Sequence, residues 1–161
     1  MTSPKQVGDV SNVRLIAHRG NITGPVPSEE NTPGHIKRAI DSGFEVEIDI
    51  WGVEGELYLG HDKPSVPVTE DELQLYKEHL WVHCKNPEAI SLLWDRGFHW
   101  FFHNQDDYTV TSRGFIWANI GVPILTPRTV SLWFDPSNPL LSREAQHSAF
   151  AICGDYVAKW A

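Results

Sequence analysis

Residues 44–62, FEVEIDIWGVEGELYLGHD, alternate between apolar and acidic side chains. A period of two is typical of a β-strand, and it predicts one over residues 45–51. The two faces of this strand are Val46, Ile48 and Ile50 on one side, and Glu45, Glu47, Asp49 and Trp51 on the other. Successive carboxylates on such a face lie about 6.6 Å apart. They repel one another and lose hydration if buried, so the face either meets water at a sheet edge or needs a cation or hydrogen bonds.

A second strand follows the first after a turn that contains Gly52 and Gly55. It is predicted over residues 56–61 and leads into the ionisable pair His61 and Asp62. The stretch that decides the fold therefore also carries groups that can take part in chemistry: the three carboxylates of its first strand and the pair His61 and Asp62.

The overall composition is that of a globular protein. A chain of 161 residues with 41% hydrophobic and 21% charged residues suits one domain with a real core. Residues 1–12 are polar and are predicted to form a flexible arm, and residues 13–161 a single barrel domain. The net charge of −8 argues against a nucleic-acid surface. It still permits a phosphate substrate where a metal or local cations reverse the field.

No stretch near the start of the chain has the apolar core of a secretory signal, and no window has the apolar length of a transmembrane helix. We therefore expect a cytoplasmic protein without a transmembrane segment. Cys84 and Cys153 are expected to be reduced and buried rather than paired.

Strands and helices alternate along the chain. Residues 13–18 and 80–85 read as strands, and each precedes a helix that starts at Thr32-Pro33 or Asn86-Pro87. This alternation predicts a parallel sheet. About eight strand candidates, including a last one at 150–157, accompany only about four helices, one of them capped by Ser142. The fold class expected is α/β, a small, cut-down TIM-type barrel with few helices, because the usual barrel needs roughly 250 residues.

Polar groups gather at the carboxyl ends of the predicted strands, which is where a parallel barrel carries its active site. Each of them alone reads as a structural residue. Together they offer imidazoles, paired carboxylates and cations, which suits metal-assisted attack on phosphorus. These residues are His18, Arg19, Glu47, Asp49, His61, Asp62, His83, Lys85 and Asp155.

Four motifs in order resemble the glycerophosphodiester phosphodiesterase family. They are His18-Arg19-Gly20, Glu30-Asn31-Thr32, Glu47-Ile48-Asp49 and His61-Asp62, and residues 152–156 look like the last barrel strand of that family. The resemblance is dense over residues 14–62 and looser beyond. It implies a TIM-barrel phosphodiesterase that uses Ca²⁺ or Mg²⁺. By motif position it implies acid and base roles for His18 and His61, metal ligation by Glu47 and Asp49, and phosphate contact by Arg19.

The sequence departs from that family at one ligand position. The family has a strand reading Ile-Glu-x-Lys, and here residues 82–85 read Val-His-Cys-Lys. Lys85 matches the phosphate-binding lysine, but His83 replaces the third acidic ligand. Imidazole suits Mn²⁺ or Zn²⁺ better than Ca²⁺ or Mg²⁺. Either the metal changes, or Glu30 or Asp62 supplies the third ligand, or the site is weakened.

Two functions from different classes follow. The first is a metal-dependent phosphodiesterase that hydrolyses a small or lipid-derived glycerophosphodiester. The second is a catalytically degenerate barrel that binds a phosphorylated ligand or a partner, which the change at His83 favours. A glycosidase is disfavoured because Glu47 and Asp49 share one strand face, whereas an acid and a base must flank the scissile bond. The sequence does not determine the oligomeric state.

Overall fold

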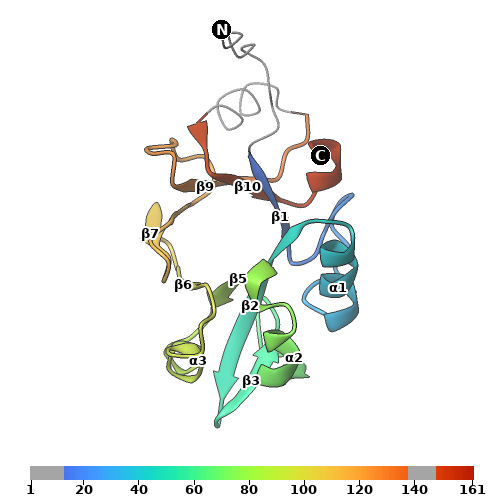
Figure 1. Ribbon diagram of the computed structural model, residues 1–161, viewed down its shortest axis with the longest axis vertical. Coiled ribbons are helices and arrows are strands. Elements are labelled where there is room, and N and C mark those ends of the chain that lie inside the picture. The colour runs from blue at the N-terminus through green and yellow to red at the C-terminus, as the bar shows by residue number, and fades with distance from the viewer. Residues whose placement is uncertain (1–12, 138–147) are drawn as a thin grey trace, which may run out of the picture.

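The structure is a computed structural model that describes residues 13–137 and 148–161. The predicted arm at residues 1–12 and the helix predicted at Ser142 lie outside the described residues. The described elements, in chain order (Figure 1), are β1 (Arg14–His18), α1 (Pro33–Asp41), β2 (Glu45–Val53), β3 (Glu56–Leu59), β4 (Val66–Val68), α2 (Glu70–Gln74), η1 (Lys77–His79), β5 (Leu80–Cys84), α3 (Pro87–Leu93), β6 (Trp100–Phe102), β7 (Tyr108–Val110), β8 (Ile116–Ala118), β9 (Thr129–Trp133), β10 (Ala151–Gly154) and η2 (Val157–Lys159).

The strands form one curled sheet. Its parallel part runs in the order β6-β5-β2-β1-β10-β9-β8, and β7 adds antiparallel to β8. Among the residues that the structure describes, no strand ladder joins the two ends, β6 and β7. They are linked instead by hydrogen bonds from Ser112 N to Trp100 O (2.8 Å) and from Thr109 Oγ1 to Phe102 O (2.9 Å). The fold is thus mixed α/β and resembles a cut-down TIM barrel.

The strand predicted over residues 56–61 forms, but it does not belong to the parallel barrel. β3 ends at Leu59 and pairs antiparallel with β2, and β4 pairs antiparallel with β3. The physical reason is the short turn at Glu54 and Gly55, both with positive φ, because two strands joined so tightly can only form a hairpin. The last predicted strand is also shorter than expected, because β10 ends at Gly154 and η2 follows.

Helices α1 and α3 begin where the sequence predicts. The side chain of Thr32 accepts a hydrogen bond from His35 N, Pro33 opens α1, and Thr69 with Glu72 forms a capping box at α2. Asn86 caps α3 in the same way as Thr32 caps α1. Figure 1 shows α1, α2 and α3 gathered around β2, β3 and β5, with β9 and β10 at the far end of the view.

The alternation of side chains separates two apolar cores. Val46, Ile48, Ile50 and Val82 belong to one buried cluster together with residues of the three helices. Inside the barrel, the rings of Trp81, Phe101 and Trp117 belong to a second cluster. Because alternate residues of the same strands serve the two cores, the acidic positions of β2 and the polar positions of β5 point inward, above these aromatic rings.

Candidate active site

A pocket of about 280 Å³ opens at the carboxyl ends of β1, β2 and β5. Residues near β6, β8 and β9 complete its walls. Seven of the nine polar residues that the sequence singles out line it together, namely His18, Arg19, Glu47, Asp49, His61, His83 and Lys85. The other two, Asp62 and Asp155, do not line it, but they bond the rings of His61 and His18. The parallel register explains this convergence, because His18 lies beside Glu47 on neighbouring strands and Asp49 lies beside His83.

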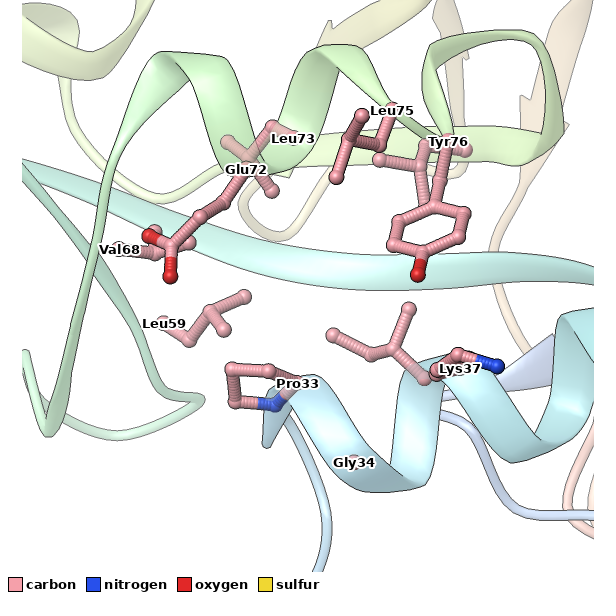
Figure 2. Close-up of a pocket in the computed structure, with 11 residues that line it drawn as sticks. Pro33, Gly34, Lys37, Leu59, Val68, Glu72, Leu73, Leu75 and Tyr76 are labelled. Atoms are coloured by element: carbon pink, nitrogen blue, oxygen red, sulfur yellow. The ribbon is translucent and has the colours of Figure 1, made fainter.

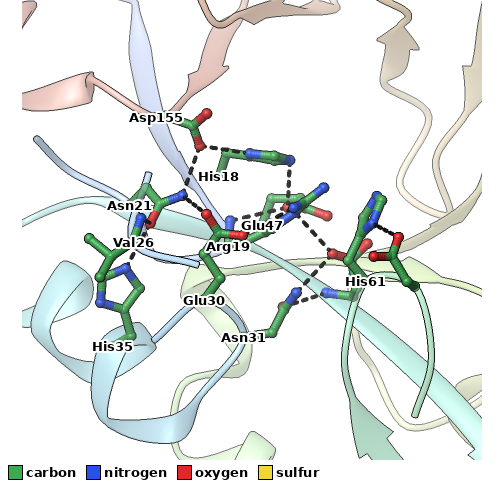
Figure 3. Close-up of polar contacts among 12 residues, drawn as sticks. His18, Arg19, Asn21, Val26, Glu30, Asn31, His35, Glu47, His61 and Asp155 are labelled. Atoms are coloured by element: carbon green, nitrogen blue, oxygen red, sulfur yellow. Dashed lines mark hydrogen bonds and ion pairs between the residues drawn. The ribbon is translucent and has the colours of Figure 1, made fainter. Parts of the chain in front are cut away.

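The two carboxylates of β2 are almost completely buried, with exposures of 2% for Glu47 and 1% for Asp49. Asn31 holds Asp49 twice: its Nδ2 donates to Asp49 Oδ2 and its Oδ1 accepts from Asp49 N, both at 2.9 Å (Figure 3). The backbone N–H of Arg19 donates to Glu47 Oε2 at 3.3 Å. These bonds fix both carboxylates while their other oxygens face the pocket.

The pKa values of the two carboxylates are shifted in opposite directions. Burial, together with the charge of Asp49, raises the pKa of Glu47 well above its usual range. Burial also acts to raise the pKa of Asp49, but a hydrogen bond and the charge of a protonated His83, together with Lys85 and Asn31, outweigh it and hold that pKa below its usual range. The neighbouring cations thus favour the charge of Asp49, whereas burial and Asp49 outweigh their effect on Glu47, and a bound cation would favour the charge of both carboxylates.

His83 faces Asp49 with one ring nitrogen. Its Nε2 lies 3.1 Å from the carbonyl oxygen of His103, which can only accept, so Nε2 carries a proton. Its Nδ1 lies 3.1 Å from Asp49 Oδ1 and 3.9 Å from Glu47 Oε1. The ring stacks on Phe101 with 4.9 Å between centroids and 13° between planes. In the neutral ring Nδ1 therefore presents a lone pair beside two carboxylates, as a metal-ligating histidine does.

The donor set fits a divalent cation. One ligand atom each from Glu47, Asp49 and His83 lie within 4.8 Å of one another. Asp49 Oδ1 is buried and has no hydrogen-bond partner among residues 13–137 and 148–161. An unsatisfied buried carboxylate oxygen is costly, and coordination would remove that cost. Two carboxylates and one imidazole are a ligand set found for Mn²⁺ and Zn²⁺.

His18 is oriented by a carboxylate. Its Nδ1 lies 2.8 Å from Asp155 Oδ1, and its Nε2 points to Glu47 Oε2 at 3.9 Å (Figure 3). Burial acts to raise the pKa of Asp155, but the hydrogen bonds of His18 and Asn21 outweigh it and lower that pKa, so the carboxylate stays ionised. An ionised carboxylate only accepts, which places the proton of neutral His18 on Nδ1 and leaves Nε2 as a base in the pocket.

His61 reaches the pocket because β2 and β3 form a hairpin. Gly60 N donates to Asp49 O at 3.1 Å, and Gly60 O accepts from Trp51 Nε1 at 2.7 Å. Gly60 has φ +151°, and a Cβ there would lie 2.1 Å from Lys63 O, so only glycine fits. The Nδ1 of His61 lies 2.7 Å from Asp62 Oδ1, and its side chain is 43% exposed. His61 therefore has the same arrangement as His18, with Nδ1 on a carboxylate.

The two cations stand beside Asp49. Arg19 Nη1 donates to Glu30 Oε2 at 3.1 Å, and its Nε lies 3.5 Å from Asp49 Oδ2. Lys85 Nζ lies 3.7 Å from Asp49 Oδ1. Arg19 has φ +55°, an uncommon backbone conformation for a residue other than glycine. Both cations are thus available to an anion in the pocket.

Some site residues are missed by the sequence reasoning. His103 lines the pocket, and Asn21 donates to both Glu30 and Asp155. The inward alternation that places Phe101 in the barrel also points to His103, two residues further on, so a pattern could have found it. No local pattern marks Asn21. Glu30 and Asp62, the alternative third ligands, bond Arg19 and His61 and lie outside the metal-ligand cluster.

Of two further pockets, one adjoins this site and the other lies apart from it. A polar one of about 530 Å³ adjoins it and shares Arg19 and His61. An apolar one of about 310 Å³ lies between α1 and α2, where Leu59, Leu73 and Tyr76 line it (Figure 2). The apolar pocket shares no lining residue with the site.

No protein-family model and no curated protein matches the chain. Among solved structures, the chain is similar to a glycerophosphodiester phosphodiesterase from Agrobacterium tumefaciens str. C58. The TM-score is 0.59 at 14% sequence identity, and the alignment covers 92% of this chain and 98% of that one. At this identity the likeness shows a shared fold alone. Among the described residues, no helix is long and apolar enough to span a membrane.

Proposed function

We propose that residues 13–161 form a single domain that hydrolyses a small glycerophosphodiester-type substrate in a metal-dependent reaction. The observation that carries the proposal is the joint placement of two carboxylate-oriented imidazoles, two buried carboxylates and two cations around one pocket. A phosphodiester needs these groups together, because its charge must be neutralised while protons move at two oxygens. The similarity of fold to a phosphodiesterase supports the same reaction class.

Glu47, Asp49 and His83 would hold the metal ion. Such an ion supplies positive charge to the phosphoryl oxygens and to the attacking group. The resemblance in sequence favours Mg²⁺ or Ca²⁺, whereas the imidazole of His83 favours Mn²⁺. Arg19 and Lys85, which border the same carboxylates, would bind the remaining phosphoryl oxygens.

His18 and His61 would move the protons. One imidazole takes the proton from the attacking oxygen, which belongs to water or to a neighbouring hydroxyl of the substrate, while that oxygen forms its bond to phosphorus. The other, protonated, gives its proton to the leaving alkoxide as the bond from phosphorus to that oxygen breaks. Asp155 and Asp62 hold the two rings so that each presents Nε2. The two histidines come from different segments, one at the end of β1 and one after the hairpin.

A second function, a non-catalytic barrel that binds a phosphorylated ligand, is favoured by one observation, the imidazole of His83 where the related family has a carboxylate. Glycoside hydrolysis is not supported, since Glu47 and Asp49 are buried side by side on one strand face.

The test is release of a phosphomonoester from glycerophosphocholine by chelator-treated protein, with and without added Mn²⁺, Mg²⁺ or Ca²⁺. The proposal expects release only with metal, and loss of both release and metal binding in the double variant Glu47→Gln with Asp49→Asn. Binding of glycerophosphocholine without turnover, in folded protein loaded with metal, would establish the non-catalytic function instead.

A further inference from the structure

One wall of the site pocket has a chemistry that the proposed reaction does not use. It is formed by residues in or just after β6, β8 and β9, and we call it the β6–β9 wall: His103, Asn104, Trp117, Ile120, Leu132 and Phe134. It combines apolar and aromatic faces with two polar side chains and carries no carboxylate, lysine or arginine. Binding sites for small neutral groups have this composition, mostly apolar with a few placed hydrogen-bonding groups.

The ring of His103 is held in one orientation. Its Nδ1 lies 2.9 Å from Asp106 Oδ2, and Asp106 Oδ1 accepts from Asn104 N at 3.1 Å. The hydrogen bond from His103, against a smaller effect of burial, keeps the pKa of Asp106 below its usual range. The carboxylate therefore accepts, Nδ1 carries the proton, and Nε2 of the neutral ring is an acceptor. The hydrogen bond to His83 uses only the backbone carbonyl of His103, and the centroids of the two rings lie 5.9 Å apart.

Neither polar side chain of the wall is satisfied within the described part of the chain. His103 Nε2 has no hydrogen-bond partner among residues 13–137 and 148–161, yet it is not one of the buried unpartnered atoms, so it borders open space. The side-chain amide of Asn104 likewise has no partner among those residues. Both residues line the site pocket, so both can bind a ligand there.

Resting on the proposed function, we infer that the β6–β9 wall binds a neutral, hydroxyl-bearing substituent of the phosphodiester. His103 Nε2 accepts a hydrogen bond from a hydroxyl, the amide of Asn104 bonds a second oxygen, and Trp117 and Leu132 contact the carbon skeleton. His103 is thus a specificity-determining residue, and Asp106 is a positioning residue that acts through it.

The adjoining polar pocket is the competing place for such a substituent. It is lined by Ser28, Lys63 and Ser65, and it also contains Glu30 and Asp62. Its fixed charges suit a charged group better than a neutral one. The two places are distinguishable because Ser28 and His103 each line only one of them.

The test compares the dissociation constants of glycerol phosphate and propyl phosphate by calorimetry in Mn²⁺-loaded protein, since the two ligands differ only in the hydroxyls. The wild type should bind glycerol phosphate about fivefold to tenfold more tightly, as one or two neutral hydrogen bonds allow. In His103→Ala, and in His103→Phe, which retains a ring, the ratio should fall to about one. In Asp106→Ala it should fall part of the way.

The control Ser28→Ala should keep the wild-type ratio. Equal affinity of the wild type for both phosphates, no binding of either, or loss of the preference in Ser28→Ala but not in the His103 variants would overturn the inference. The readout is binding, so it is independent of turnover. A protein with the preference but without diester hydrolysis would refute the proposed reaction and leave this assignment standing.

Discussion

The Nδ1 atom of His83 lies 3.1 Å from Oδ1 of Asp49, a buried carboxylate oxygen that has no hydrogen-bond partner among residues 13–137 and 148–161. The other ring nitrogen of His83 bonds a carbonyl oxygen that can only accept. A metal ion held by Nδ1 and the two β2 carboxylates would satisfy both atoms. The identity of residue 83 should therefore decide which metal the site prefers.

His83→Glu should change that preference. The wild type should bind Mn²⁺ or Zn²⁺ at least about tenfold more tightly than Ca²⁺ or Mg²⁺, because imidazole is a poor ligand for the harder ions. The variant, with three carboxylates, should gain affinity for Ca²⁺ and Mg²⁺. Calorimetric titration with each metal measures this, and His79→Ala, which removes an exposed imidazole, should behave as the wild type does. A wild type that prefers Ca²⁺ would contradict the assignment of His83.

Gly60→Ala should weaken both the fold and the site. An added Cβ would lie 2.1 Å from Lys63 O, and Gly60 N bonds Asp49 O, so the hairpin end that carries His61 must shift. We expect a loss of about 2 kcal/mol or more in the free energy of unfolding and a fall in turnover.

Gly55→Ala is the matched control in the same hairpin. It also has a positive φ, +83°, but a Cβ there meets nothing within 4 Å, so it should cost about 1 kcal/mol and leave turnover unchanged. Chemical denaturation and an activity assay measure both variants. Equal losses of stability, or normal turnover in Gly60→Ala, would show that Gly60 does not position His61.

Acid should destabilise the fold through His99. Burial and then the charge of Arg113 lower the pKa of this histidine from 6.5 to about 4. Between these values the unfolded chain binds a proton that the folded chain does not, so the free energy of unfolding falls as the pH drops from 6.5 to 4. The contribution should be about 3 kcal/mol.

To isolate the effect of His99, the free energy of unfolding is measured as a function of pH in the wild type and in His99→Gln. The decline between pH 6.5 and 4 should be shallower in the variant, whatever its stability at neutral pH. His79→Gln, an exposed imidazole, should retain the wild-type slope. If all three proteins show the same slope, His99 is not neutral in the folded state.

Much of the site could be predicted from the sequence because it depends on local patterns. The period of two in β2 and β5 places Glu47, Asp49 and His83 on inward faces, and parallel pairing brings those faces together. The order and spacing of the sequence motifs predicted His18 and His61 as further residues of the site. The capping residues Thr32 and Asn86 marked the starts of α1 and α3 correctly.

The rest of the site and of the fold depends on contacts between residues distant in sequence, and no local pattern records such contacts. Asn31 holds Asp49 across 18 positions, and Asp155 orients His18 across 137. The strand at 56–61 was wrongly placed in the parallel barrel, because its alternation shows a strand but not its partner or direction. Within the described residues no strand ladder joins β6 to β7, and this too depends on tertiary packing and not on a local pattern.

The two histidines proposed as acid and base provide the most direct test of the proposed function. His18 and His61 each have Nδ1 on a carboxylate and line the same pocket, so each should serve as acid or base. An acid–base group typically contributes about 10²–10⁴-fold to the rate.

The decisive measurement is the turnover number for glycerophosphocholine of metal-loaded His61→Ala, taken beside its melting temperature. The account predicts a loss of at least about 100-fold with an unchanged melting temperature and unchanged metal affinity. His18→Ala should behave in the same way, and the wild-type rate should be bell-shaped in pH. Near-normal turnover in His61→Ala, or a melting temperature that falls in step with the rate, would contradict a catalytic role for this histidine.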